Sequence, residues 1–213
     1  MRLPSRRQFF WIATGAGGTA GLVRAAWMRR QKGGEGGDGV ALQGTRGTLH
    51  AVRQTDWALG SEVSITALHA DAGVARAAIG AAVRELRLVE SLMSIYRPQS
   101  ELSRLNREAS LENPHPYLVA VVRQAAEMSR RSGGAFDITV QPLWALYEAA
   151  RRAGTLPEAR AIEAAVATVD WRHVEVTARR IRLHGPNTAV TLNGIAQGFA
   201  ADRLTAALRS FPA

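Results

Sequence analysis

The amino-acid sequence predicts an α+β fold, a mixed sheet with packed helices in a single domain. Residues 62–68 alternate apolar and polar side chains, as a strand does. Residues 74–93 repeat apolar side chains at steps of three and four, which gives a long helix one apolar face. The alternating segments 174–176 and 181–183 flank a short polar turn and indicate a β-hairpin. Strands and helices are therefore mixed along the chain.

The remaining elements follow from the same kinds of signal. Four further segments are predicted as elements: helices at about 116–131, 157–168 and 198–209, and a short strand at 188–192. Pro98 ends the long helix, and Ser100 can cap a further helical turn. Gly133 and Gly134 can adopt the left-handed conformation that ends the helix before them.

The composition limits the classes of partner. The chain has 213 residues, of which 46% are hydrophobic, and a net charge of +9. Residues 1–32 hold seven of the 27 Lys and Arg residues and no acidic residue, so the rest carries 20 basic against 18 acidic side chains. Without a basic stripe there, we expect no nucleic-acid partner. The absence of cysteine excludes disulfides and thiolate metal sites.

The N-terminus resembles a twin-arginine export signal. Arg6 and Arg7 precede a modest apolar run, so residues 1–32 are predicted to be a signal segment. The alternative is a disordered basic tail. Residues 33–43 are a Gly-rich linker by composition, and residues 44–213 form the predicted domain. The expected location is the periplasm, or a membrane facing the periplasm if the signal segment is retained as an anchor.

The first motif spans residues 90–106, where the long helix ends. Tyr96 stands just before the break at Pro98 and can stack on an aromatic ligand. The alternative is a plain helix–loop–helix corner in which Tyr96 is half-buried.

The second motif spans residues 133–143. Its two glycines let the backbone approach a ligand closely. Asp137 lies between apolar neighbours, and a partly buried carboxylate needs a partner such as a ribose, an adenine amine or a backbone donor. The alternative is a helix end that leads into an edge strand.

The third motif spans residues 191–204, where Asn193 and Gly194 form a turn before a helix. Free N–H groups and the helix dipole meet at such a junction and favour an anion. Two glycines at this spacing are weak evidence for phosphate, so a plain strand–turn–helix junction is the alternative.

Together and in this order, the three motifs resemble the FAD:protein FMN transferases, the ApbE-like family. The family's Ser-x-Tyr corner, with Ser-Glu-Leu and Asn after it, is similar to residues 94–106. Its Gly-x-Phe-Asp-Ile-Thr-x-x-Pro-Leu segment is similar to residues 134–143, and its Gly-Ile-Ala-(Lys/Gln)-Gly-(Tyr/Phe)-Ala-x-Asp segment to residues 194–202. The resemblance begins near residue 57, where Leu59-Gly60-Ser61 resembles the family's Met-Gly-Thr.

The resemblance implies a Mg²⁺-dependent enzyme that splits the pyrophosphate of FAD and transfers FMN to a threonine of an exported acceptor flavoprotein, releasing AMP. A respiratory membrane protein is one acceptor that fits. By position, the residues that would contact FAD are Leu59, Tyr96, Ala135, Phe136, Asp137, Thr191 and Gln197. Many relatives carry Asp at the position of Thr191, and Lys is common at that of Gln197. Gly194 falls where a backbone carbonyl would reach the metal; catalytic residues stay unassigned.

The resemblance also implies a departure from the family. Relatives continue beyond the third motif with acidic and threonine side chains that complete the metal site, so we expect this domain to lack its C-terminal part. One alternative function is therefore a non-catalytic, exported FAD-binding protein that has lost the metal site. Another is a structural partner in an envelope respiratory complex, which the intact second and third motifs disfavour.

Overall fold

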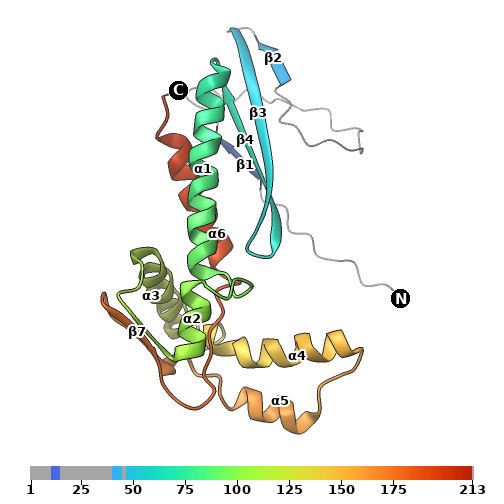
Figure 1. Ribbon diagram of the computed structural model, residues 1–213, viewed down its shortest axis with the longest axis vertical. Coiled ribbons are helices and arrows are strands. Elements are labelled where there is room, and N and C mark those ends of the chain that lie inside the picture. Colours follow the sequence, from blue (N-terminus) through green and yellow to red (C-terminus); the bar gives the residue numbers. More distant parts are fainter. Residues whose placement is uncertain (1–10, 15–39, 45–46, 213) are drawn as a thin grey trace. The chain divides into compact units, whose positions relative to one another are not determined.

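The computed structural model describes residues 11–14, 40–44 and 47–212 (Figure 1). The chain divides into two compact units, one of residues 1–85 with 201–213 and the other of residues 86–200. The arginine pair of the predicted signal and linker residues 33–39 lie outside the described residues.

The first unit contains a four-stranded sheet in the order β1-β4-β3-β2. Its strands are β1 (Trp11–Thr14), β2 (Val40–Gly44), β3 (Gly47–Ala58) and β4 (Ser61–His69). Strands β3 and β4 form a long antiparallel hairpin (Figure 1), which confirms the predicted strand at 62–68. Strand β3 was not predicted, and β2 overlaps the end of the predicted linker.

Two helices have residues in both units, α1 (Ala72–Met93) and α6 (Ala196–Arg209). The three- and four-residue spacing expected for α1 appears in its buried side chains, which include Ile79, Leu86 and Val89. Both helices were predicted, with α6 starting two residues earlier than expected.

The second unit holds helices and a small sheet. Its helices are α2 (Glu101–Glu108), α3 (Pro116–Arg131), α4 (Gln141–Ala153) and α5 (Ala159–Val166), with short 3₁₀ turns η1 (Ile138–Val140) and η2 (Trp171–His173). Its antiparallel sheet has the order β5-β7-β6, from β5 (Ser110–Glu112), β6 (Val174–Val176) and β7 (Arg180–Leu183). The predicted α3 and the β6–β7 hairpin are confirmed.

The prediction of a strand at 188–192 is wrong. The segment is buried as a central strand would be, because Val190 and Leu192 are fully buried and Thr191 is 8% exposed. However, the backbone there bonds to the side chain of Asn106 and to the carbonyl of Ile138 instead of to a neighbouring strand. Burial can thus produce a strand-like pattern without a sheet.

The region after Gly134 does not form the edge strand of the alternative interpretation. The chain forms the η1 turn and then α4, so no edge strand follows the helix end. Helices α4 and α5 run side by side as a helical hairpin (Figure 1). None of the helices in the described part of the chain is long and apolar enough to cross a membrane.

Candidate functional site

The three motifs are joined in the second unit by hydrogen bonds between segments far apart in sequence. The Asn106 side chain of the first motif donates from Nδ2 to the Val190 carbonyl and accepts at Oδ1 from the Val190 N–H, both at 2.8 Å. The Thr191 N–H of the third motif donates to the Ile138 carbonyl of the second at 2.8 Å. Sequence order had suggested one site, and these contacts bring the motifs together.

The first motif forms a tight corner between α1 and α2. The Tyr96 N–H donates to Ser94 Oγ at 3.2 Å, and Ser100 Oγ donates to the Ser94 carbonyl at 2.7 Å. Ser100 Oγ also accepts from the Ser103 N–H at 3.0 Å, which confirms the predicted N-cap of α2. Local hydrogen bonds therefore fix the backbone on both sides of Tyr96.

The Tyr96 ring is exposed at this corner. Tyr96 is 53% exposed between α1 and α2, so the alternative of a helix–loop–helix corner with a half-buried tyrosine stays open. The ring meets Trp144 of α4 edge-on, with 6.3 Å between ring centroids. An exposed aromatic ring can stack on a flat ligand.

A buried carboxylate supports the same corner. The Glu90 side chain is only 9% exposed, and its Oε2 accepts from Arg97 Nη2 at 2.7 Å and from Arg87 Nη1 at 3.4 Å. Such a charge is tolerated inside a protein only when paired. Because Arg97 follows Tyr96 directly, this ion pair also anchors the chain next to the exposed ring.

The second motif begins with two glycines in the left-handed region, at φ 63° for Gly133 and 89° for Gly134, as predicted. A Cβ added to Gly134 would lie 3.9 Å from the Trp171 indole. The next residue, Ala135, is exposed, and Phe136 is half-buried. A Cβ on Gly194 would lie 3.4 Å from Phe136 Cε2, so the turn of the third motif packs closely on this ring.

Asp137 has several partners within the protein. Its Oδ1 accepts from the Thr139 N–H at 2.8 Å and from Thr139 Oγ1 at 2.6 Å. Its Oδ2 accepts from the Trp171 N–H at 2.9 Å. Of the partners expected for this carboxylate, the structure contains backbone donors. An ionised carboxylate has about four acceptor positions, so a contact with FAD stays a prediction.

The third motif turns outward after its buried start. Thr191 is 8% exposed, and its Oγ1 accepts from the Asn193 N–H at 3.3 Å. The Leu192 carbonyl accepts from the Ile195 and Ala196 N–H groups at 2.9 and 2.7 Å, which starts α6. Asn193 and Gly194 are exposed, as the N-terminal turn of a helix must be to meet an anion.

The other two predicted site residues differ in what surrounds them. Gln197 is half-buried in the first turn of α6. Leu59 belongs to the first unit, where it forms the β3–β4 turn with Gly60 and has a positive φ of 51°. The contacts described above join Phe136 to Gly194 and Ile138 to Thr191, and none of them involves Leu59.

Three residues that sequence reasoning did not assign take part in this arrangement: Asn106, Trp144 and Trp171. Asn106 directly follows the buried Leu105 near the end of a short helix, which is a detectable signal for a polar side chain directed at another segment. Trp144 and Trp171 lie outside the three motifs, and no sequence pattern pointed to them.

The metal requirement can be compared with the side chains present. Among the described residues, no group of three or more His, Asp or Glu side chains is placed to hold a metal ion. A carbonyl such as that of Gly194 is a single oxygen ligand, and Mg²⁺ needs several. The described side chains therefore do not fit a complete magnesium site.

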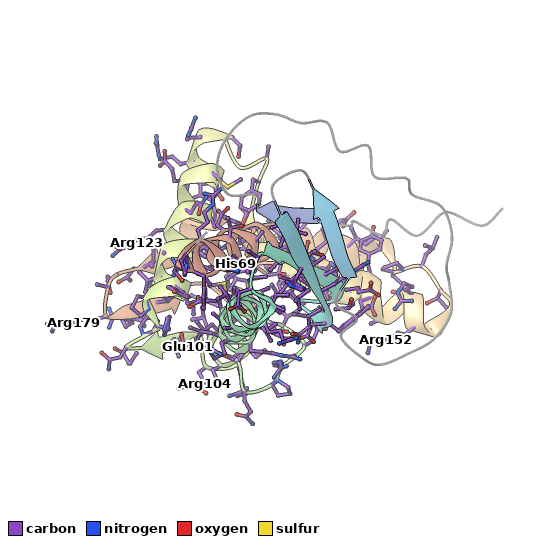
Figure 2. All side chains as sticks on the ribbon, turned by 90° about the horizontal axis from the view of Figure 1, so that it is seen from above. His69, Glu101, Arg104, Arg123, Arg152 and Arg179 are labelled. Carbon is purple, nitrogen blue, oxygen red and sulfur yellow. The ribbon has the colours of Figure 1, made fainter. Side chains whose placement is uncertain are left out.

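The charges of the second unit are dispersed. Figure 2 shows Arg104, Arg123, Arg152 and Arg179 on separate parts of the periphery, and all four are exposed. Binding of nucleic acid needs such side chains gathered along one surface. The expectation of no nucleic-acid partner stays a prediction.

Comparison with known proteins gives relatives of one kind. The FAD:protein FMN transferase of Vibrio cholerae serotype O1 is 32% identical over 135 residues, which are 60% of this chain and 39% of that protein. The enzyme of the same name from Chlamydia pneumoniae is 29% identical over 128 residues, covering 58% and 40%. This chain thus spans about two-fifths of the length of these relatives.

Solved structures of the same kind share the fold. A mutant of the flavin transferase ApbE from Vibrio cholerae matches with a TM-score of 0.67 and 26% identity, over 76% of this chain and 57% of that one. The ApbE protein of Thermotoga maritima matches with a TM-score of 0.67 and 22% identity, over 76% and 53%. These neighbours confirm the α+β fold class.

The family comparison covers all three motifs. Residues 59–212 match the ApbE family, from the β3–β4 turn through the tyrosine corner to the end of α6 and beyond. The matched region includes every residue predicted to contact FAD or the metal. The chain belongs to the ApbE family.

Proposed function

We propose that this chain binds FAD and serves in the Mg²⁺-dependent transfer of FMN from FAD to a threonine of an exported acceptor protein. The support is its family and the name of its relatives, FAD:protein FMN transferase. The observation that carries the proposal is the junction of the three motifs. Asn106 and Ile138 hold the start of the third motif, and its glycine turn is exposed beside Phe136.

The proposed roles of the residues follow their chemistry. Tyr96 offers an exposed ring for stacking, and Ala135 and Phe136 offer an exposed backbone and a ring edge next to the Gly194 turn. The first turn of α6, with Gln197, offers hydrogen-bond donors to a phosphate. Leu59, Asp137 and Thr191 complete the proposed set of FAD contacts, and the Gly194 carbonyl is proposed as a ligand of Mg²⁺.

In the proposed reaction, the threonine oxygen forms a bond to the phosphorus of the FMN half while the pyrophosphate bond to AMP breaks. The hydroxyl proton is lost and AMP leaves. When bound, Mg²⁺ supplies charge stabilisation on the phosphate oxygens. Because the described side chains do not form a complete magnesium site, no step is assigned to the ion here.

The same observation favours a second candidate, a non-catalytic FAD-binding protein. The two candidates separate in one experiment. The 213-residue chain is incubated with FAD, Mg²⁺ and a threonine-bearing acceptor, and covalent FMN is sought by mass spectrometry, while FAD binding is followed by quenching of flavin fluorescence. For this chain alone, we expect FAD binding with negligible transfer of FMN, which is the result that the second candidate predicts. Metal-dependent transfer would establish the transferase, and absence of FAD binding would refute both.

Export is proposed on the sequence of residues 1–32 alone. Arg6 and Arg7, followed by Phe9 and an apolar run, favour delivery to the periplasm by the twin-arginine route, with the segment either removed or kept as a membrane anchor. Replacing both arginines with lysine should leave the protein in the cytoplasm. Undiminished delivery of this variant would contradict the proposal, and wild-type chain in the same cells is the control.

A further inference from the structure

Asn106 makes an unusual pair of contacts. Both halves of its carboxamide bond the backbone of one residue, Val190, which lies 84 positions away in sequence. The N–H and the C=O of Val190 are both satisfied at 2.8 Å, as they would be by a neighbouring strand in an antiparallel sheet. The side chain thus takes the place of the strand that residues 188–192 do not have.

A second contact with a distant segment holds the chain next to Val190. Val190 and Leu192 are fully buried, and the Thr191 N–H donates to the Ile138 carbonyl at 2.8 Å. Asn193 and Gly194 are exposed, and α6 begins at Ala196. Two adjacent contacts with distant segments therefore precede the Gly194 turn, one made by Asn106 at Val190 and one made by Ile138 at Thr191.

We propose that Asn106 is a positioning residue for FAD binding, which acts by holding Val190 so that Thr191, Gly194 and Gln197 keep their places. The proposal rests on the proposed function. Asn106 is not assigned a contact with FAD. Its role requires one donor and one acceptor side by side, and among side chains of this size only an amide or a protonated carboxylic acid provides both.

That requirement gives a test in which the pH reverses the defect. In Asn106→Asp, the ionised carboxylate can accept from the Val190 N–H but faces the Val190 carbonyl without a proton to donate. At pH 7.5 we expect FAD to bind at least about tenfold more weakly than to wild type, the effect of losing one buried hydrogen bond with repulsion added. As the pH falls toward 5 and then 4, protonation restores the donor, and the ratio of the two dissociation constants should approach one. Dividing by the wild-type value at each pH removes any effect of pH on FAD itself.

Two further variants separate positioning from general loss of stability. Asn106→Leu keeps the approximate size but removes both bonds, so its FAD binding should be weak at every pH. Ile181→Val removes one methyl group from a fully buried residue of β7, which lies outside the three motifs in sequence, at a cost of about 0.5–1.5 kcal/mol in stability. It should leave FAD affinity unchanged.

Hydrogen exchange measures the position of the segment without FAD. The amides of residues 190–194 should exchange at least tenfold faster in Asn106→Leu than in Ile181→Val, each compared with wild type. Three outcomes would overturn the proposal. The first is wild-type FAD affinity in both Asn106 variants, and the second is an equal loss of FAD affinity in Ile181→Val. The third is a loss of FAD affinity in Asn106→Asp that does not change with pH. If wild type fails to bind FAD, the proposed function fails, and unchanged exchange in Asn106→Leu would then refute the positioning role separately.

Discussion

The second and third motifs both combine glycines with polar residues among apolar neighbours, but they differ in how their polar groups are used. In the second, Asp137 accepts three hydrogen bonds from Thr139 and Trp171, and Thr139 is fully buried. In the third, Asn193 and Gly194 are exposed. Near Gly198, no atom in the described part of the chain lies within 4 Å of the place a Cβ would take. One motif is mainly internal scaffold, and the other presents an open backbone.

This difference shows that a polar residue among apolar neighbours has two explanations that the sequence does not separate. A carboxylate such as Asp137 can be satisfied by its own chain or by a ligand. A glycine can be needed for a left-handed backbone, as at Gly134, or can leave open space beside the backbone, as at Gly198. Three substitutions test whether a polar or small residue serves the fold or a ligand, and the one with the largest expected effect comes first.

Asp137→Ala should give the largest loss of stability. The change leaves the N–H groups of Thr139 and Trp171 and the Thr139 hydroxyl without their acceptor, at a cost of about 3–5 kcal/mol in the free energy of unfolding. Urea unfolding followed by circular dichroism measures it. Asp170→Ala is the matched control, because Asp170 accepts only local bonds from Arg172, and it should cost clearly less.

The same variant sharpens the comparison of the two motifs. If Asp137 served only as an FAD contact, Asp137→Ala would unfold like wild type and differ only in its FAD dissociation constant, by about ten- to hundredfold. A stability change below about 0.5 kcal/mol would contradict the scaffold assignment. FAD titrations therefore need to be made at a temperature where both proteins are folded.

Much of the fold was predictable because its signals are local. The spacing of apolar residues identified α1 and α3, Ser100 identified the start of α2, and Gly133 with Gly134 identified the end of α3. Helix α4 was missed, because its first residues, Pro142 among them, were assigned to the second motif, for which the alternative was an edge strand. Pro is well placed at the start of a helix, so the signal was present but was interpreted otherwise.

The site was predictable only in part, since its decisive contacts are not local. The motifs identified the right segments, and the contacts of Phe136 with Gly194 and of Ile138 with Thr191 join them. Nothing in the sequence pairs Asn106 with Val190, because a side chain that replaces a strand leaves no periodic pattern. The strand predicted at 188–192 was wrong for a related reason, because the sequence does not show that Asn106 takes the place of a neighbouring strand.

The second prediction concerns the open backbone of the third motif. Gly198→Ala should raise the free energy of unfolding by a few tenths to about 1 kcal/mol, because alanine favours a helix and nothing in the described chain obstructs its methyl group. If a ligand approaches the backbone there, the same methyl group should weaken FAD binding at least about tenfold.

The matched control is Gly80→Ala in α1. A Cβ there would meet Arg84 Nη1 at 3.6 Å, an ordinary contact, so the variant should also gain stability. Its FAD affinity should stay at the wild-type value. Unchanged affinity in Gly198→Ala would show that the open space near Gly198 is not used by FAD.

The smallest effect is expected at the surface of α4, which directly follows the second motif. Hydrogen bonds from Arg151, and to a lesser degree from Arg152, lower the pKa of Glu148 from 4.5 to about 2. A carboxylate with a lowered pKa in the folded state stabilises the protein above pH 4.5, and that contribution disappears as the pH falls through about 2. Both arginine side chains are more than 70% exposed, so solvent weakens the pairs.

Glu148→Gln should lower the melting temperature by only about 1–2 °C at pH 6, and the difference should shrink between pH 4.5 and pH 2 and in 1 M NaCl. A difference in melting temperature that stays constant over this pH range would show that these charges do not stabilise the fold. Helix packing alone would then account for the effect of the substitution.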